Sequence, residues 1–216
     1  MNARIMRIAR HRMGTDGGGV SSLVAFWGCP LQCRYCLNDF CHDPKTPCRE
    51  MESEELARKL MVDEIYYRMS GGGIVFGGGE PLLNAEYIKE VVELIPDDIP
   101  IRVETSLNVP WKDVEILCGL VDDWIIDIKD LNPEIYVRYT GIDNSGVKGN
   151  CKKLVEQCRM QGTDPKQHIL FRVPLISGFN TEKDVEKSAA ELADFGRIDR
   201  FTYRVLNTEN GRENLH

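Results

Sequence analysis

Three cysteines, Cys29, Cys33 and Cys36, stand within eight residues in a C-x3-C-x2-C spacing. Thiols this close together can bind a metal, bind an iron–sulfur cluster or form disulfides. A tetrahedral zinc site takes a fourth ligand, commonly with a C-x2-C pair at each end. A [4Fe–4S] cluster normally takes four thiolates, so three would leave one iron open to a small molecule. The spacing therefore favours a cluster with one open iron.

The aromatic Tyr35 directly before the last of these cysteines completes a C-x3-C-x-aromatic-C pattern. This pattern resembles the cluster loop of the radical S-adenosylmethionine (radical SAM) superfamily. The resemblance implies one [4Fe–4S] cluster on Cys29, Cys33 and Cys36, with SAM bound at the open iron and Tyr35 beside the cofactors. The alternative is that the three cysteines form a structural zinc site or pack as core thiols.

A glycine-rich turn, Gly77-Gly78-Gly79-Glu80-Pro81, follows the next apolar segment. Such a turn can be only a loop, but glycine also lets bare backbone approach a ligand closely. Because it lies one strand–helix unit after the cysteine loop, it resembles the Gly-Gly-Glu-Pro motif of radical SAM proteins. The resemblance implies that Gly78, Gly79 and Glu80 receive the ammonium group of SAM.

Polar side chains also stand where two later apolar segments end, at Glu104, Thr105, Ser106, Asp127 and Lys129. Asp127 lies among isoleucines, where a buried carboxylate needs a cation or hydrogen-bond donors. Its surroundings resemble the Asp-Ile-Lys segment of glycyl radical enzyme activating enzymes. The resemblance implies that Lys129 contacts the SAM carboxylate and that Glu104 and Ser106 lie beside SAM. It also implies a monovalent cation site at Glu104, Thr105 and Asp127, although the pattern in that group has Asp at the position of Glu104.

The resemblance continues through residues 139–141 and 172–180 and spans roughly residues 20 to 207. It implies that Arg172 reaches the SAM site from a further strand. The chain departs from the pattern at two places. Asn207 stands where the group often has a histidine that contacts the SAM ribose, and Ser21-Ser22 stand where an arginine is expected.

The elements that must position these residues alternate along the chain. Apolar segments at 22–27, 74–76, 101–104, 124–128, 168–173 and 201–205 predict strands, preceded by a short strand at 2–9. The intervening periodicity predicts helices at 53–69 with Ser53 as N-cap, after Asn84, after Pro110, after Asn132, at 147–160 and from Thr181 to about 195. Residues 39–50 contain two prolines and should be irregular.

Six alternations of strand and helix predict parallel strands joined by right-handed crossovers. The expected fold is a single α/β domain over residues 1–216, an open, partial (β/α)6 TIM-like barrel. In such barrels the chemistry gathers at the C-terminal ends of the strands. All the polar residues singled out above fall at those ends.

The composition restricts the class of protein. A formal net charge of −7 argues against a nucleic-acid partner. No apolar run approaches the ~18 residues of a membrane span, and the basic N-terminus lacks the apolar core of a signal peptide. We therefore expect a cytoplasmic protein, whose eight cysteines suggest metal or redox chemistry rather than disulfides.

The remaining cysteines fall into two groups. Cys118, Cys151 and Cys158 lie at helical spacing on apolar faces and should pack in the core. Cys41 and Cys48, with His42, lie in the segment expected to be irregular, and the sequence assigns them no role. No C-x2-C-x2-C-x3-C insertion follows the cysteine loop, so auxiliary clusters are not expected.

The resemblance implies that a 5′-deoxyadenosyl radical made from SAM takes a hydrogen from a glycine of a partner glycyl radical enzyme. It also implies an electron donor of flavodoxin or ferredoxin type. One alternative is a radical SAM enzyme that acts on a small molecule or a ribosomal peptide. Another is a non-catalytic iron–sulfur electron carrier or redox sensor, which would leave Glu80, Asp127, Lys129 and Arg172 without a role.

Overall fold

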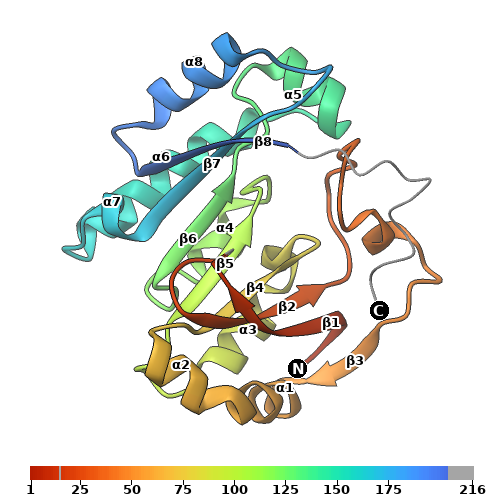
Figure 1. The fold of residues 1–216 in the computed structure, drawn as a ribbon, viewed down its shortest axis with the longest axis vertical. Coiled ribbons are helices and arrows are strands. Elements are labelled where there is room, and N and C mark those ends of the chain that lie inside the picture. The colour runs from red at the N-terminus through yellow and green to blue at the C-terminus, as the bar shows by residue number, and fades with distance from the viewer. Residues whose placement is uncertain (15, 204–216) are drawn as a thin grey trace.

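Eight strands form one sheet in the order β3-β1-β2-β4-β5-β6-β7-β8 (Figure 1). The structure is a computed structural model that describes residues 1–14 and 16–203. All neighbours from β2 to β8 pair in parallel, whereas β1 pairs antiparallel with both β2 and β3. The strands are β1 Asn2–Met13, β2 Val20–Phe26, β3 Arg49–Glu52, β4 Ile74–Gly78, β5 Ile101–Thr105, β6 Asp123–Asp127, β7 Ile169–Leu175 and β8 Arg197–Thr202.

The helices connect successive parallel strands. In Figure 1 the sheet curves from β3 at the lower right to β8 at the top, with the helices outside the curve and the segment after β2, in orange, on its open side. The α-helices are α1 Ser53–Leu60, α2 Glu64–Ser70, α3 Ala85–Val92, α4 Trp111–Glu115, α5 Pro133–Thr140, α6 Ser145–Met160, α7 Pro165–His168 and α8 Glu182–Leu192. Three short 3₁₀ helices are η1 Asp39–His42, η2 Met61–Asp63 and η3 Pro81–Asn84. The six parallel strands confirm the predicted open, partial (β/α)6 barrel.

Strand alternation separates an apolar face from a charged one. On β5, Ile101 and Val103 belong to the buried core. Arg102 and Glu104 between and after them therefore lie on the opposite, concave face, because successive strand side chains point to opposite sides. The same alternation holds for Trp124 and Ile126 against Asp127 on β6, and for Phe171 and Val173 against Arg172 on β7. Charged residues thus line the inside of the partial barrel.

The N-terminal part departs most from the sequence prediction. The strand predicted at 2–9 extends to Met13. Residues 49–52 form β3 beside it, although residues 49 and 50 belong to the segment at 39–50 that was expected to be irregular. β3 was missed because it is a four-residue edge strand, Arg-Glu-Met-Glu, without an apolar run. The strand predicted at 201–205 begins earlier, since β8 Arg197–Thr202 pairs with β7 over its whole length. Residues 204 and 205 of that prediction lie outside the described residues.

The helix predicted at 53–69 is broken by η2. Buried Asp63 occupies the N-cap position of α2 but turns its carboxylate to Arg10, at 2.5 Å from Nε, and to His11, at 3.0 Å from Nε2, both on β1. The predicted N-cap at Ser53 is wrong as well. Glu52 holds that position, and the Ser53 hydroxyl donates to Glu90 at 3.0 Å.

None of the helices in the described residues is both long enough and apolar enough to cross a bilayer.

Helix starts at Asn132 and Thr181 are as predicted. The Asn132 side chain accepts from the Glu134 amide, and Thr181 forms a capping box with Asp184. Asn84 stands at the N-cap position of α3 but makes no side-chain cap.

Candidate active site at the C-terminal ends of the strands

The cysteine loop follows β2 and is fixed by backbone hydrogen bonds at several points. The amide of Gln32 donates to the Thr140 carbonyl at 2.8 Å, and that of Arg34 donates to the Tyr139 carbonyl at 3.1 Å, both in the last turn of α5. The amide of Gly28 donates to the Cys41 carbonyl at 3.1 Å. The loop is therefore held between the end of α5 and η1, two elements far apart in the sequence.

Cys29, Cys33 and Cys36 are all reduced and half-buried. Burial raises the pKa of each thiol, that of Cys33 to about 11, while the positive charge of Lys129 lowers the pKa of Cys33 and Cys36. Metal coordination deprotonates such thiols outright. Half-buried thiols with raised pKa are weak free nucleophiles, so they fit a cluster with bound thiolates better than a free redox pair.

The glycine-rich turn after β4 lies directly against the cysteine loop. The amide of Gly79 donates to the Phe26 carbonyl at 3.0 Å, and the amide of Glu80 donates to the Gly28 carbonyl at 2.8 Å. A Cβ on Gly79 would lie 2.1 Å from the Gly28 carbonyl oxygen, so this approach requires glycine. Gly78 has φ +91°, and its carbonyl accepts a hydrogen bond from Asn38 at 3.1 Å.

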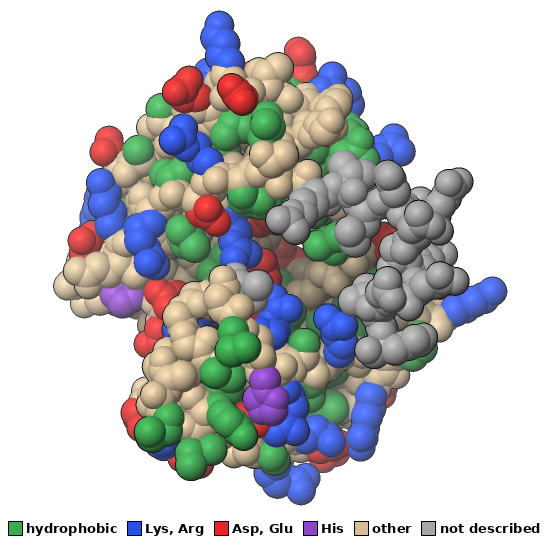
Figure 2. Space-filling view, in the orientation of Figure 1, with side chains coloured by type: hydrophobic (Ala, Val, Ile, Leu, Met, Phe, Trp, Pro, Cys, Tyr) green, Lys and Arg blue, Asp and Glu red, His purple; other side chains and the backbone are tan. Residues whose placement is uncertain are grey.

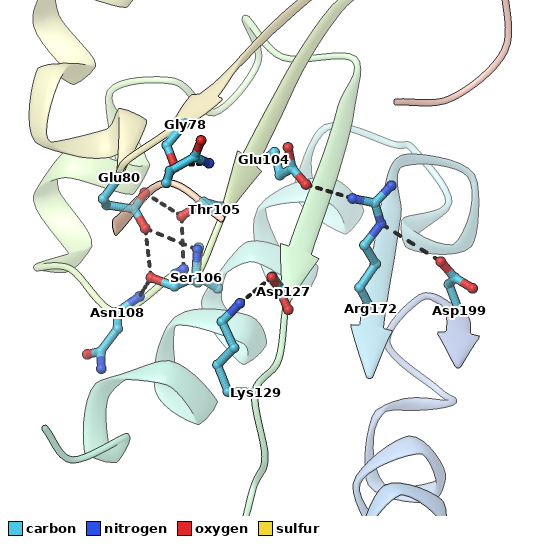
Figure 3. A network of polar contacts seen from close by, with 12 residues as sticks. Gly78, Glu80, Glu104, Thr105, Ser106, Asn108, Asp127, Lys129, Arg172 and Asp199 are labelled. Atoms are coloured by element: carbon cyan, nitrogen blue, oxygen red, sulfur yellow. Dashed lines mark hydrogen bonds and ion pairs between the residues drawn. The ribbon is translucent and has the colours of Figure 1, made fainter. Parts of the chain in front are cut away.

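Glu80 is fully buried and accepts four hydrogen bonds (Figure 3). The Thr105 hydroxyl donates at 2.6 Å, the Ser106 hydroxyl at 2.7 Å, the Ser106 amide at 3.0 Å and the Leu82 amide at 3.3 Å. Burial raises the pKa of Glu80, and the hydrogen bonds oppose that shift. An arriving ammonium group would therefore have to share or replace one of these donors, of which the Leu82 amide is the most distant.

The carboxylates of Glu104 on β5 and Asp127 on β6 are paired with cations instead (Figure 3). Lys129 is buried and forms an ion pair with Asp127, whose other oxygen has no hydrogen-bond partner. Burial alone would lower the pKa of Lys129, but the charges around it, Asp127 first among them, raise it. Arg172 pairs with Glu104 at 2.6 Å and lies 3.8 Å from Asp199.

These residues come from four successive parallel strands and converge at one end of the sheet. Figure 2 shows Lys and Arg side chains, in blue, beside acidic ones, in red, around the hollow at the centre of this face. The sequence-family model of the radical SAM superfamily matches residues 24–192, which is most of the chain. The protein is a radical SAM enzyme.

Its similar proteins include glycyl radical enzyme activating enzymes. The (2S)-3-sulfopropanediol dehydratase activating enzyme of Klebsiella oxytoca is 34% identical over 143 residues, which cover 65% of this chain and 43% of that protein. The pyruvate formate-lyase-activating enzyme of Staphylococcus aureus (strain USA300) is 28% identical over 180 residues, which cover 80% and 68%. The chain thus spans less than half of the first relative and about two thirds of the second.

Among solved structures, a domain of a pyruvate-formate lyase-activating enzyme from Bacteroides vulgatus ATCC 8482 superimposes with a TM-score of 0.52 at 26% identity. The match covers 64% of this chain and 88% of that one. The activating enzymes therefore share both sequence and fold with this radical SAM chain, which is homologous to them.

The donor set fits the cofactors that the superfamily implies, a [4Fe–4S] cluster and SAM. In the described part of the chain, no three His, Cys, Asp or Glu side chains converge as ligands of a single metal ion. A cubane does not need such convergence, because each thiolate binds a different iron. The glycine cradle and the unpaired, buried oxygen of Asp127 further indicate a polar ligand at this end of the sheet.

The three residues of the predicted cation site each have another partner in this structure. Glu104 pairs with Arg172, Thr105 donates to Glu80 and Asp127 pairs with Lys129. Glu104 and Asp127 are nevertheless close enough for the charge of Asp127 to raise the pKa of Glu104 further, beyond the effect of burial. A monovalent cation between the two carboxylates would relieve this repulsion, so the site stays a prediction.

An aromatic cluster beside the cysteine loop was not assigned as a group from the sequence. The Tyr35 ring lies 5.6 Å from that of Phe179, and the Tyr139 ring lies 5.0 Å from Phe179 and 6.4 Å from Tyr203. Tyr35 is thus fixed edge-on between α5 and the turn after β7. Apart from Tyr35, which belongs to the cysteine-loop pattern, these aromatics carry no motif spacing, and the resemblance at 139–141 and 172–180 pointed only to the segments of Tyr139 and Phe179. Asn207 lies outside the described residues.

The cysteines without a predicted role are explained in part. Cys48 accepts a hydrogen bond from Arg4 Nε at 3.1 Å, and the Arg4 guanidinium lies 3.7 Å above the Trp27 ring. Cys48 therefore ties the end of the loop to β1, and Cys41 is buried on η1. Cys151 and Cys158 are buried in the core and Cys118 packs against it, as predicted.

Proposed function

We propose that this radical SAM enzyme is an activating enzyme that abstracts hydrogen from a glycine of a partner glycyl radical enzyme. The observation that carries this proposal is the similarity of most of the chain to two activating enzymes. It is supported by the span of the family match, residues 24–192, which includes the cysteine loop and Glu80, Asp127, Lys129 and Arg172.

Cys29, Cys33 and Cys36 would hold the [4Fe–4S] cluster, with one iron left for SAM. When bound, the cluster supplies one electron that cleaves SAM into methionine and a 5′-deoxyadenosyl radical. An electron donor of flavodoxin or ferredoxin type would supply that electron in turn.

The chain's own residues would bind and orient SAM. Gly78, Gly79 and Glu80 offer carbonyl and carboxylate oxygens to its ammonium group. Lys129 is buried and charged, and its ion pair with Asp127 holds the Lys129 ammonium group at the strand end. Lys129 is therefore suited to bind the carboxylate of SAM. Tyr35 and Ser106 would complete the pocket around the methionine part.

Arg172 and Glu104 lie deeper on the concave face, and their ion pair can open to receive a ligand because both side chains keep partial exposure. With Asp127 and Thr105, Glu104 would also surround the monovalent cation.

Within the described residues, the sheet ends at β3 and β8 without closing. An extended glycine-bearing segment could therefore approach the concave face from the open side.

The test is anaerobic incubation of the reconstituted enzyme with SAM, a reductant and a candidate glycyl radical enzyme. We expect a glycyl radical doublet in the EPR spectrum of the partner, together with 5′-deoxyadenosine. Cys33→Ala should abolish both, since it removes a cluster ligand. The matched control Cys151→Ala removes a buried core thiol and should keep both.

Two outcomes would favour other functions. Formation of 5′-deoxyadenosine without a glycyl radical on any partner would favour a small molecule or a ribosomal peptide as substrate. A cluster that binds no SAM would favour an iron–sulfur electron carrier or redox sensor and would leave the residues around Glu80 unexplained.

A further inference from the structure

Leu107, in the turn after β5, has a backbone conformation that leucine rarely adopts. Its φ is +57°, in the left-handed region, and its side chain is fully buried. Among the described residues only one other non-glycine residue, His11, has a positive φ. Such a conformation costs on the order of 1–3 kcal/mol and persists where the surrounding structure enforces it, often at functional sites.

This conformation accompanies an unusual arrangement of two neighbouring hydroxyls. Thr105 and Ser106 both donate to the Glu80 carboxylate, at 2.6 Å and 2.7 Å (Figure 3). Consecutive residues of an extended strand point to opposite faces, so both can reach one carboxylate only if the chain leaves the strand at this point. β5 ends at Thr105, and the left-handed Leu107 lies in the turn that directly follows.

The turn itself orients the two hydroxyls. The Leu107 amide donates to the Thr105 hydroxyl at 2.9 Å, and the Asn108 amide donates to the Ser106 hydroxyl at 3.4 Å. Each hydroxyl therefore accepts from the amide two residues on, which leaves its own hydrogen for Glu80. Three of the four hydrogen bonds on Glu80 thus depend on this turn.

Two asparagine side chains hold the turn, Asn150 from α6 and Asn108 from the end of the turn itself. Asn150, buried on α6, donates to the carbonyls of Leu107 at 3.1 Å and Val109 at 2.8 Å. Asn108 donates to the Tyr136 hydroxyl at 3.1 Å and to the Asp143 carbonyl at 2.8 Å. Asn150 thus uses both hydrogens of its amide group on the two carbonyls that flank the turn.

We propose that Asn150 is a positioning residue: it holds the left-handed turn at Leu107, so that Thr105 and Ser106 fix the Glu80 carboxylate for the SAM ammonium group. This inference rests on the proposed role of Glu80 in binding SAM. Asn150 itself reaches neither SAM nor the cluster in this assignment. It acts through the backbone of Leu107 and Val109.

The first test uses the chain without cofactors. Asn150→Leu has a similar volume and no donor, so the turn should relax, and amide hydrogen exchange at Ser106 and Leu107 should become about tenfold faster. Asn144→Leu is the matched control. Asn144 is equally buried and donates to two carbonyls, those of Asp130 and Leu131, but in the loop after β6. It should leave the exchange of Ser106 and Leu107 unchanged.

The second test measures SAM affinity of the reconstituted enzyme. We expect Asn150→Leu to raise the dissociation constant of SAM about tenfold with unchanged iron content. Asn150→Gln, which keeps the donors on a longer stem, should recover part of the affinity. Thr181→Ala removes the N-cap of α8, far along the chain from the turn, and should lower stability without changing SAM affinity.

Unchanged exchange, or faster exchange with unchanged SAM affinity, would overturn the inference. If Asn150→Leu fails to fold, Asn108→Ala at the half-buried end of the turn must show the same two changes, and their absence overturns it equally. An enzyme that binds SAM through this turn but activates no glycyl radical enzyme overturns only the proposed partner reaction.

Discussion

The two halves of the site hold their carboxylates by different means. Between β4 and β5, Glu80 is surrounded by neutral donors, two hydroxyls and two backbone amides. Further along the sheet, Glu104 on β5 faces Arg172 on β7, and Asp127 on β6 faces Lys129. The Glu80 carboxylate is fully buried, whereas the side chains of Asp127 and Glu104 are 23% and 28% exposed.

The difference suggests a division of labour. Neutral hydrogen bonds from a fixed turn act at short range and hold one geometry, so the Glu80 half is organised before any ligand arrives. Ion pairs between long side chains can exchange partners at little cost when they are partly exposed. The Lys129 and Arg172 half is therefore suited to transfer its cations from protein carboxylates to a ligand.

The largest effect should come from removing the fixed carboxylate. Glu80→Ala leaves four buried donors without their acceptor, the hydroxyls of Thr105 and Ser106 and the amides of Ser106 and Leu82, at ~1–3 kcal/mol each. Some of that loss should be recovered by relaxation, so we expect a decrease of about 3 kcal/mol in the free energy of unfolding. Urea denaturation of the chain without cofactors measures it.

The matched change is Glu104→Ala on the other half, which frees a partly exposed arginine that water can solvate. Glu104→Ala should lower the free energy of unfolding by less than ~1 kcal/mol. Equal losses for the two variants would contradict the view that one half is rigid and the other exchangeable.

An intermediate effect is expected from Lys129→Met. The substitution preserves the volume of the side chain but leaves Asp127 without the cation it faces, and one oxygen of Asp127 is already unpaired. We expect a loss of about 2 kcal/mol in the free energy of unfolding, below that of a fully buried pair because Asp127 keeps some exposure. Adding Asp127→Asn should recover part of it.

The pH dependence of the same pair has a definite sign. The folded-state pKa of Lys129 is raised, so the stability it contributes is fully present below its unfolded pKa and is lost only as the pH rises through the folded value. The cost of Lys129→Met should therefore be the same at pH 6 and pH 9. A cost that fell between these values would show that Lys129 loses its proton in this range.

The sequence indicated which residues meet but not how they pair. Parallel strands deliver their C-terminal ends to one edge, so Glu80, Glu104, Asp127 and Arg172 could be placed together from their positions alone. Whether Glu104 faces Arg172 or a cation depends on side-chain directions across the sheet, which no spacing encodes.

Residues that act from a distance were beyond sequence reasoning as well. Asn150 lies 43 positions after Leu107 on a helix, in no motif, and reads as an ordinary polar residue. Its role depends on the left-handed backbone of Leu107, and leucine gives no local signal for that conformation. The short strand β3 was not predicted because its residues are mostly polar, which suits an exposed edge strand but is also typical of a loop.

The smallest effect, and the one that separates the two halves most directly, is their response to salt. A double-mutant cycle on Glu104→Gln and Arg172→Gln should give a coupling of ~0.5–1 kcal/mol at low ionic strength, because both side chains are partly exposed. Raising the salt concentration to about 1 M shortens the screening length to ~3 Å and should reduce that coupling by about half. The parallel cycle on Glu80→Gln and Ser106→Ala removes a buried hydrogen bond, and its coupling should not change with salt. If both couplings fell together, Glu80 would also depend on screened charges, and the contrast between a fixed and an exchangeable half would not hold.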